Sequence, residues 1–326
     1  MSGTSDAAVL VTSRSFGRAA PGLRRELEAA VAEVRYNELG RPLGPDELRE
    51  ALAGVDGVIA GVERFDDSAI SAAPRLRAIA RHGTGTDGVD LAAARRRGIV
   101  VTNTPGANSE AVAELAIGLM FALARRIPQQ HAETRAGSWR AVQGVQLAGR
   151  TVGLLGLGRV GTAVARRAAA LGCEVIGFDP AVAPGEARAM GVRLATTEEV
   201  AAGADFMSLH LPVTAETTDL VDAALLAAMR PVAYLVNTGR GELVVERDLL
   251  EALERGALAG AALDTLREEP PPPDHPLLGR DDVIVTPHAG AQTAEAGAAM
   301  GRLALDDLLA VLDGRPPRHP VELPDG

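Results

Sequence analysis

Three ionisable side chains, those of Arg240, Glu269 and His288, each follow a short apolar run that is typical of a buried strand. Because the carboxyl ends of parallel strands meet along one edge of a sheet, we expect these side chains to lie close together. An imidazole exchanges a proton near neutral pH, and a nearby carboxylate favours its charged form. A guanidinium group can hold a substrate carboxylate and polarise the adjacent carbonyl. Each residue alone also fits a structural or solvated role, but their shared placement predicts proton transfer to a 2-keto acid.

The stretch 151–179 has the order of a dinucleotide-binding unit: a buried strand, a glycine-rich turn, a helix, a second strand and a terminal acid. Gly156, Gly158 and Gly161 have the spacing G-x-G-x-x-G. The first glycine allows a tight turn, the second lets a pyrophosphate approach the backbone, and the third lets the helix pack on the strand. Asp179 can accept hydrogen bonds from ribose hydroxyls and would repel a 2′-phosphate. We therefore predict an NAD site and favour NAD over NADP.

A second glycine-rich loop, at 82–90, follows a predicted strand in the first third of the chain. The backbone N–H groups of Gly83 and Gly85 can hold an anion such as a carboxylate, although a plain glycine turn is the alternative. His82 lies in this loop and is expected to touch the ligand. His210 follows another predicted strand and is expected to shape the adenine pocket.

Composition excludes several other functions. The net charge of −10 argues against a general nucleic-acid or anionic-membrane surface. The sequence contains no lysine, which excludes Schiff-base catalysis and a Walker-type phosphate loop. No spacing of histidine, cysteine and acidic residues suggests a metal site. Neither a leader peptide nor an apolar stretch of membrane-spanning length is evident, so a cytoplasmic protein without membrane partners is expected.

Strands alternate with helices along most of the sequence, which is typical of doubly wound parallel sheets. The length of 326 residues favours two domains. A long apolar helix is expected over 109–126 and ends before Pro128. The segment 129–147 is less regular and is expected to form an arm onto a partner subunit. A final helix at 303–312 is expected to return to the first domain, and the tail from Gly314 is expected to be poorly ordered.

These motifs together resemble the D-isomer-specific 2-hydroxyacid dehydrogenases, most closely the phosphoglycerate dehydrogenase branch. The resemblance covers nearly the whole chain and rests on Gly83–Asp90, Asn103–Ser109, Gly156–Gly161, Asn237–Gly241, Ala262–Asp264 with Glu268–Pro270, and Thr286–Gly290. It implies an α/β fold of two doubly wound parallel-sheet domains. A Rossmann NAD-binding domain at 103–289 would be inserted in a flavodoxin-like substrate domain formed by 1–102 and 290–326. It also implies a homodimer.

The resemblance assigns Arg240, Glu269 and His288 to catalysis, with Glu269 pairing the acid/base His288. The NAD site implied by these patterns comprises Thr84, Gly156, Gly158, Arg159, Val160, Gly161, Asp179, His210, Leu211, Pro212, Thr238, Gly239, Asp264 and Gly290. The substrate site comprises Arg64, Arg81, His82, Gly83, Thr84, Gly85, Arg240 and His288. No metal is expected.

The substrate implied is a small anionic 2-hydroxy or 2-keto acid, with 3-phosphoglycerate as the first candidate. Human-type phosphoglycerate dehydrogenases carry an arginine near position 61, where this chain has Gly61, so Arg64 and Arg81 remain as phosphate candidates. Glyoxylate or hydroxypyruvate reduction is the alternative, and an NAD-sensing protein like the family's corepressors is the alternative of another class. No regulatory domain follows residue 314, so feedback through one is not expected.

Overall fold

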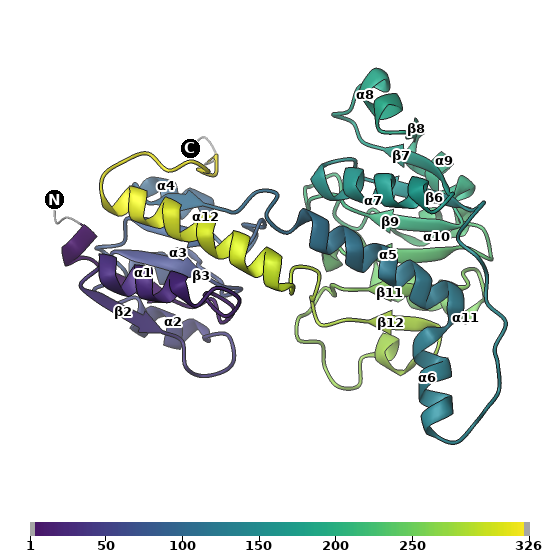
Figure 1. Ribbon diagram of the computed structural model, residues 1–326, viewed down its shortest axis with the longest axis horizontal. Coiled ribbons are helices and arrows are strands. Elements are labelled where there is room, and N and C mark those ends of the chain that lie inside the picture. The colour runs from purple at the N-terminus through teal and green to yellow at the C-terminus, as the bar shows by residue number, and fades with distance from the viewer. Residues whose placement is uncertain (1–3, 323–326) are drawn as a thin grey trace. The chain divides into compact units, whose positions relative to one another are not determined.

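The computed structural model describes residues 4–322, and the chain divides into two compact units (Figure 1). The first unit contains the chain up to Asn108 and again from Gln292, and the second contains Ser109–Ala291. Each unit is built on a sheet whose strands are all parallel, so the expected α/β class is confirmed. The domain boundaries expected from the sequence, at residues 102 and 289, lie a few residues before those of the structure, at Asn108 and Ala291.

The first unit is a five-stranded sheet with the order β2-β1-β3-β4-β5. Its strands are β1 (Ala8–Val11), β2 (Glu33–Tyr36), β3 (Gly57–Ala60), β4 (Ala78–Arg81) and β5 (Val100–Thr102). Its helices are α1 (Gly22–Ala30), α2 (Pro45–Ala51), α3 (Asp67–Ser71), α4 (Leu91–Arg96) and α12 (Ala294–Leu312), and a 3₁₀ turn, η1 (Thr4–Asp6), precedes β1. Alternate strand residues face two cores: Val9 and Ile59 pack with α1 and α12, whereas Leu10 and Val58 pack with α2, α3 and α4.

The second unit is a seven-stranded sheet with the order β12-β11-β10-β9-β6-β7-β8. Its strands are β6 (Thr151–Leu155), β7 (Glu174–Phe178), β8 (Arg193–Leu194), β9 (Phe206–Leu209), β10 (Tyr234–Asn237), β11 (Gly260–Leu263) and β12 (Val283–Val285). Its helices are α5 (Ser109–Arg125), α6 (Ile127–Arg135), α7 (Arg159–Ala170), α8 (Pro184–Ala189), α9 (Thr197–Gly203), α10 (Ala223–Ala228) and α11 (Glu246–Glu254), with 3₁₀ turns η2 (Gly241–Leu243) and η3 (Pro276–Gly279).

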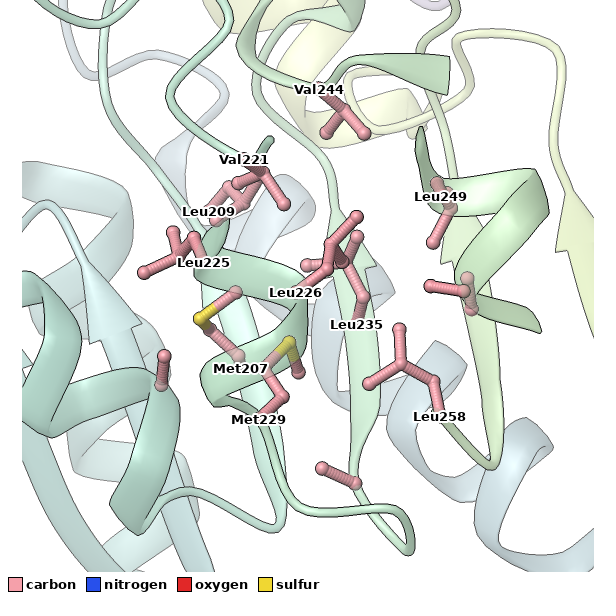
Figure 2. Packing of buried hydrophobic residues seen from close by; sticks show 14 of the residues in the cluster. Met207, Leu209, Val221, Leu225, Leu226, Met229, Leu235, Val244, Leu249 and Leu258 are labelled. Atoms are coloured by element: carbon pink, nitrogen blue, oxygen red, sulfur yellow. The ribbon is translucent and has the colours of Figure 1, made fainter. Parts of the chain in front are cut away.

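Two apolar layers enclose this larger sheet. On one face, Met207 of β9 and Leu235 of β10 pack with Leu226 of α10 and Leu249 of α11 (Figure 2). On the other face, α5 and α7 cover the sheet with small and branched residues, among them Ala113, Leu119, Val164 and Ala168. With few aromatic side chains available, close packing rests on alanine, valine and leucine.

Strand order places one topological switch point in each unit. In the first sheet the chain runs outward from β1 to β2 on one side and from β3 to β5 on the other, so the switch lies between β1 and β3. In the second sheet the switch lies between β6 and β9. Open α/β sheets bind ligands outside the carboxyl ends of the strands at such points. These two edges are therefore where functional side chains are expected.

Two regions differ from the sequence-based expectation. The long helix ends before Pro128, as expected, but the segment after it begins with a second helix. Arg126 adopts a left-handed conformation (φ 49°), and α6 begins directly after it with Pro128 in its first turn. The stretch after Gly314 does not form a disordered tail up to residue 322. Pro320 pairs with Thr102 of β5, and His319 Nδ1 lies 2.9 Å from the carboxylate of Asp307, which is only 1% exposed.

Candidate active site

His288 and Glu269 form a close pair beyond the carboxyl ends of β11 and β12. The Nδ1 atom of His288 lies 2.8 Å from Oε2 of Glu269, while Oε1 of Glu269 accepts a hydrogen bond from the backbone N–H of Leu266 at 3.1 Å. Both side chains remain partly open to solvent, at 44% and 38% exposure. The imidazole can therefore meet a ligand through its other nitrogen while the carboxylate fixes its orientation.

Burial opposes the ionisation of Glu269, but the hydrogen bond and charge of His288 outweigh it. The Leu266 N–H and the charge of Arg240 act in the same direction as His288. The pKa of Glu269 consequently lies below its usual range. At neutral pH the pair therefore contains the Glu269 carboxylate.

The loop that carries His288 is anchored by a buried acid, Asp264. Its carboxylate is 2% exposed and accepts hydrogen bonds from Thr286 Oγ1 at 2.6 Å and from the backbone N–H groups of Ala289 at 2.7 Å and Gly290 at 2.8 Å. His288 itself has a left-handed backbone (φ 50°), and its N–H donates to the carbonyl of Asp264 at 2.9 Å. Asp264 therefore holds both ends of the turn on which His288 sits.

A buried amide shapes the loop of Arg240 in a similar way. Asn237, which is fully buried, donates through Nδ2 to the carbonyl of Arg240 at 2.7 Å and accepts the N–H of Gly239 at 3.0 Å. A side chain at Gly241 would place Cβ 2.1 Å from the backbone of Leu266, so only glycine allows this close approach. The approach brings the half-buried Arg240 loop against the segment that leads to Glu269. The three predicted catalytic residues thus lie together in the second unit.

The glycine-rich turn after β6 has the form that a dinucleotide requires. Gly156 has φ +99°, and a Cβ there would lie 2.6 Å from the carbonyl oxygen of His210; a Cβ at Gly161 would lie 2.0 Å from the carbonyl oxygen of Gly156. By contrast, a Cβ at Gly158 would meet nothing within 4 Å. Gly158 is also the N-cap of α7 and provides no side-chain cap for the free N–H groups. The turn is therefore closed where helix and strand pack and open where phosphates approach a helix amino end.

Asp179 ends the strand next to this turn. One carboxylate oxygen accepts the N–H of Leu157 at 2.8 Å and the other accepts the N–H of Ala181 at 2.9 Å. A carboxylate has further lone pairs for ribose hydroxyls. The side chain is thus held at the edge of the phosphate-binding turn, and the residues present fit a dinucleotide.

The remaining residues of the expected NAD site fall into two groups. All but Thr84 follow strand ends of the second unit: Arg159 and Val160 after β6, His210, Leu211 and Pro212 after β9, Thr238 and Gly239 after β10, Asp264 after β11, and Gly290 after β12. Thr84 belongs to the first unit, where its hydroxyl donates to Oδ1 of Asn108 at 3.1 Å. Loss of water contact lowers the pKa of His210 to about 4, so this imidazole is neutral at pH 7.

The expected substrate loop lies at the carboxyl end of β4 in the first unit. Arg81 donates from Nε to the carbonyl of Gly85 and from Nη1 to that of Ala60, both at 3.0 Å, so it braces the loop. Gly83 is half-buried, and Arg64 is exposed.

The side chain of His82 is turned into the first unit. It is 8% exposed, and its Nδ1 lies 3.0 Å from the hydroxyl of Ser13 while its ring meets Phe16 edge to face. Burial lowers its pKa to about 4, which makes it a neutral packing residue. The ligand contact expected from the sequence is not tested by this placement.

Other candidate sites are few in the described part of the chain. Between residues 4 and 322, no group of three or more histidine, cysteine or acidic side chains could hold a metal ion. Among the same residues, no helix combines the length and apolar character needed to cross a bilayer.

With this geometry in place, the comparison with known proteins defines the class. The chain belongs to the D-isomer specific 2-hydroxyacid dehydrogenase family, whose NAD-binding domain model matches residues 117–290, within the second unit. The sequence-based assignment to this family, with its NAD-binding domain, is confirmed. The NAD specificity deduced from Asp179 is not tested by this match.

Individual relatives and solved structures are similar to this chain over most of its length. The chain is 40% identical to D-3-phosphoglycerate dehydrogenase of Methanocaldococcus jannaschii over 90% of its own length and 56% of that enzyme, so it spans about half the length of such relatives. It is 38% identical to glyoxylate reductase of Korarchaeum cryptofilum, over 79% of each chain. The crystal structure of the TT0316 protein from Thermus thermophilus is similar with a TM-score of 0.86 at 40% identity, over 97% of this chain and all of that one.

Proposed function

We propose that this protein is an NAD-dependent oxidoreductase that interconverts a D-2-hydroxy acid and its 2-keto acid. The observation that carries the proposal is the pair of His288 and Glu269, 2.8 Å apart. With the loop of Arg240, the pair stands along the same sheet edge as the open glycine turn after β6. Family membership supports the same reaction class.

The mechanism divides between the cofactor and three side chains. NADH, when bound, supplies the hydride for the carbonyl carbon, and the turn around Gly158 with Asp179 would hold it. Arg240 binds the substrate carboxylate and polarises the adjacent carbonyl. His288 donates its proton to the carbonyl oxygen as that oxygen becomes a hydroxyl, and it accepts the proton in the reverse direction. Glu269 keeps the imidazole oriented and stabilises its charged form.

The relatives favour two classes of substrate. One is 3-phosphoglycerate with its keto acid, and the other is the unphosphorylated 2-keto acids glyoxylate and hydroxypyruvate. Arg64 and Arg81 remain the candidates for a phosphate, and the backbone of Gly83, Thr84 and Gly85 the candidate for the carboxylate.

A homodimer is the assembly we propose, through α6 and the segment that follows it up to residue 147. Trp139 is 93% exposed and Ile127 is 51% exposed, and a partner subunit would cover these apolar side chains. Light scattering of the purified protein tests this, and a mass equal to that of one chain would contradict it. Trp139→Ser should weaken the dimer, and Leu39→Ser on the first unit, at a residue that is 54% exposed, is the matched control that should leave it intact.

The reaction is tested by NADH oxidation, followed by absorbance, with 3-phosphohydroxypyruvate, hydroxypyruvate, glyoxylate, pyruvate and 2-ketoglutarate. Turnover of at least one acid is expected. Binding of NADH without turnover of any acid would refute the proposal and favour an NAD-sensing protein.

A further inference from the structure

The switch point of the first unit gathers polar groups that the proposed mechanism does not use. Thr12 and Ser13 follow β1, and Gly61 and Glu63 follow β3, so all four lie at the carboxyl edge between these neighbouring strands. This is the position at which an open parallel sheet of this strand order binds its ligand. The segment of Glu63 also lies against the predicted substrate loop, because the N–H of Phe65 donates to the carbonyl of Gly88 at 2.7 Å.

Glu63 is the unusual member of this group. Its side chain belongs to a residue that is 4% exposed, one oxygen accepts the hydroxyl of Thr12 at 2.6 Å, and the other accepts the N–H of Leu43 at 3.4 Å. Within residues 4–322 no arginine or histidine forms an ion pair with it. A carboxylate buried without a cation is costly and is poorly screened by water.

A second buried acid, at the other end of β3, is paired with a cation, as buried carboxylates usually are. Asp56 precedes β3 at its amino end and is 3% exposed. It accepts the N–H of Ala8 at 2.9 Å and pairs with Arg75 at 2.6 Å. The acid at the structural edge therefore has a cation, while the acid at the ligand edge has only neutral donors.

Gly61 reserves the space that this carboxylate occupies. A Cβ at Gly61 would lie 2.7 Å from Oε2 of Glu63 and 3.1 Å from Cα of Ser13. A side chain at position 61, and an arginine above all, therefore does not fit while Glu63 keeps its position. Of the two phosphate candidates, Arg64 is exposed, and Arg81 donates to the backbone carbonyls of Ala60 and Gly85.

We infer that Glu63 determines substrate specificity by excluding a phosphate and favouring an unphosphorylated 2-keto acid, such as hydroxypyruvate or glyoxylate. The inference rests on the proposed function and selects between its two substrates. A phosphate near the β1/β3 edge meets the oxygens of Glu63 with no cation beside them, whereas a hydroxyl group can donate a hydrogen bond to such an oxygen. Glu63 acts on the part of the substrate that differs between the two acids and takes no part in the proton transfer.

The test uses hydroxypyruvate and 3-phosphohydroxypyruvate, which differ only in the phosphate. The measured quantity is the ratio of their kcat/KM values, which is independent of the fraction of active enzyme. We expect wild type to prefer hydroxypyruvate by roughly 10-fold or more, and Glu63→Gln to reduce that ratio by about 10-fold. Asp56→Asn, which removes a buried charge from the opposite end of β3, is the matched control and should leave the ratio unchanged.

Each outcome decides the inference. A wild-type preference for 3-phosphohydroxypyruvate would overturn the inference even if Glu63→Gln does not fold. An unchanged kcat/KM ratio in Glu63→Gln would also overturn it, and so would an equal change of that ratio in Asp56→Asn. Absence of turnover with every 2-keto acid would instead refute the proposed function, and the inference would fall with it.

Discussion

Replacing Glu269 with glutamine removes the charge beside His288 but keeps the size of the side chain. Two opposite unit charges 2.8 Å apart, the separation of Oε2 and Nδ1, attract by roughly 6 kcal/mol at a dielectric constant of 20 and roughly 1.5 kcal/mol in water. Because the two side chains are 44% and 38% exposed, the lower end applies, about 1.5–2 kcal/mol. We therefore expect kcat for 2-keto acid reduction to fall about 10- to 30-fold.

The assay is steady-state NADH oxidation at saturating substrate, with NADH affinity measured separately by fluorescence. Glu268→Gln is the matched control, because Glu268 is the exposed neighbour of Glu269 and lies outside the pair with His288. NADH affinity should stay within about 2-fold in both variants. Equal kcat in Glu269→Gln and Glu268→Gln would refute the assigned role of the carboxylate.

The pH dependence of the pair follows from the lowered pKa of Glu269. A carboxyl group whose pKa is lower in the folded protein contributes stability that is present above its unfolded pKa, roughly pH 4.3. That contribution is lost as pH falls through the lower, folded pKa. The Glu269 carboxylate therefore stays ionised through the neutral range.

The other predictions concern the cofactor turn and the fold. Gly161→Ala should lower the melting temperature, because its Cβ would lie 2.0 Å from a carbonyl oxygen. Gly158→Ala should leave the melting temperature unchanged and weaken NADH binding, because its Cβ meets nothing within 4 Å on the side where phosphates approach. Equal melting temperatures of the two variants would contradict this account. Asp179→Ala should raise the KM for NADH about 10-fold and reduce the preference over NADPH, and an unchanged preference would remove Asp179 from the ribose. His319→Ala should lower the free energy of unfolding in urea by about 2 kcal/mol, because it removes a hydrogen-bond partner from the buried carboxylate of Asp307, and Asp307→Asn in that background should restore part of the loss.

Much of the architecture was predictable because it depends on local pattern. The strand, glycine turn, helix and strand of 151–178 are specified by apolar runs and glycine spacing, and the structure places β6, α7 and β7 there. Residues that follow strand ends could be assigned to one edge because parallel strands share direction. The predicted meeting of Arg240, Glu269 and His288 is found in the structure for this reason.

The remainder depends on long-range contacts that sequence patterns do not encode. The anchoring of the His288 turn by Asp264 needs four residues brought together from the segments that follow β11 and β12. Likewise, the burial of His82 is decided by Ser13 and Phe16, far from it in sequence. The ordered path of 315–322 could not be predicted from a proline-rich composition, because it depends on Asp307 and β5.

The central claim is that His288 exchanges the proton during reduction of a 2-keto acid. The measurement that tests it most directly is the single-turnover rate of NADH oxidation in wild type and His288→Gln, with NADH and substrate both saturating. The account predicts unchanged NADH binding and a rate that falls by about 10²- to 10⁴-fold. An unchanged rate in His288→Gln would contradict it.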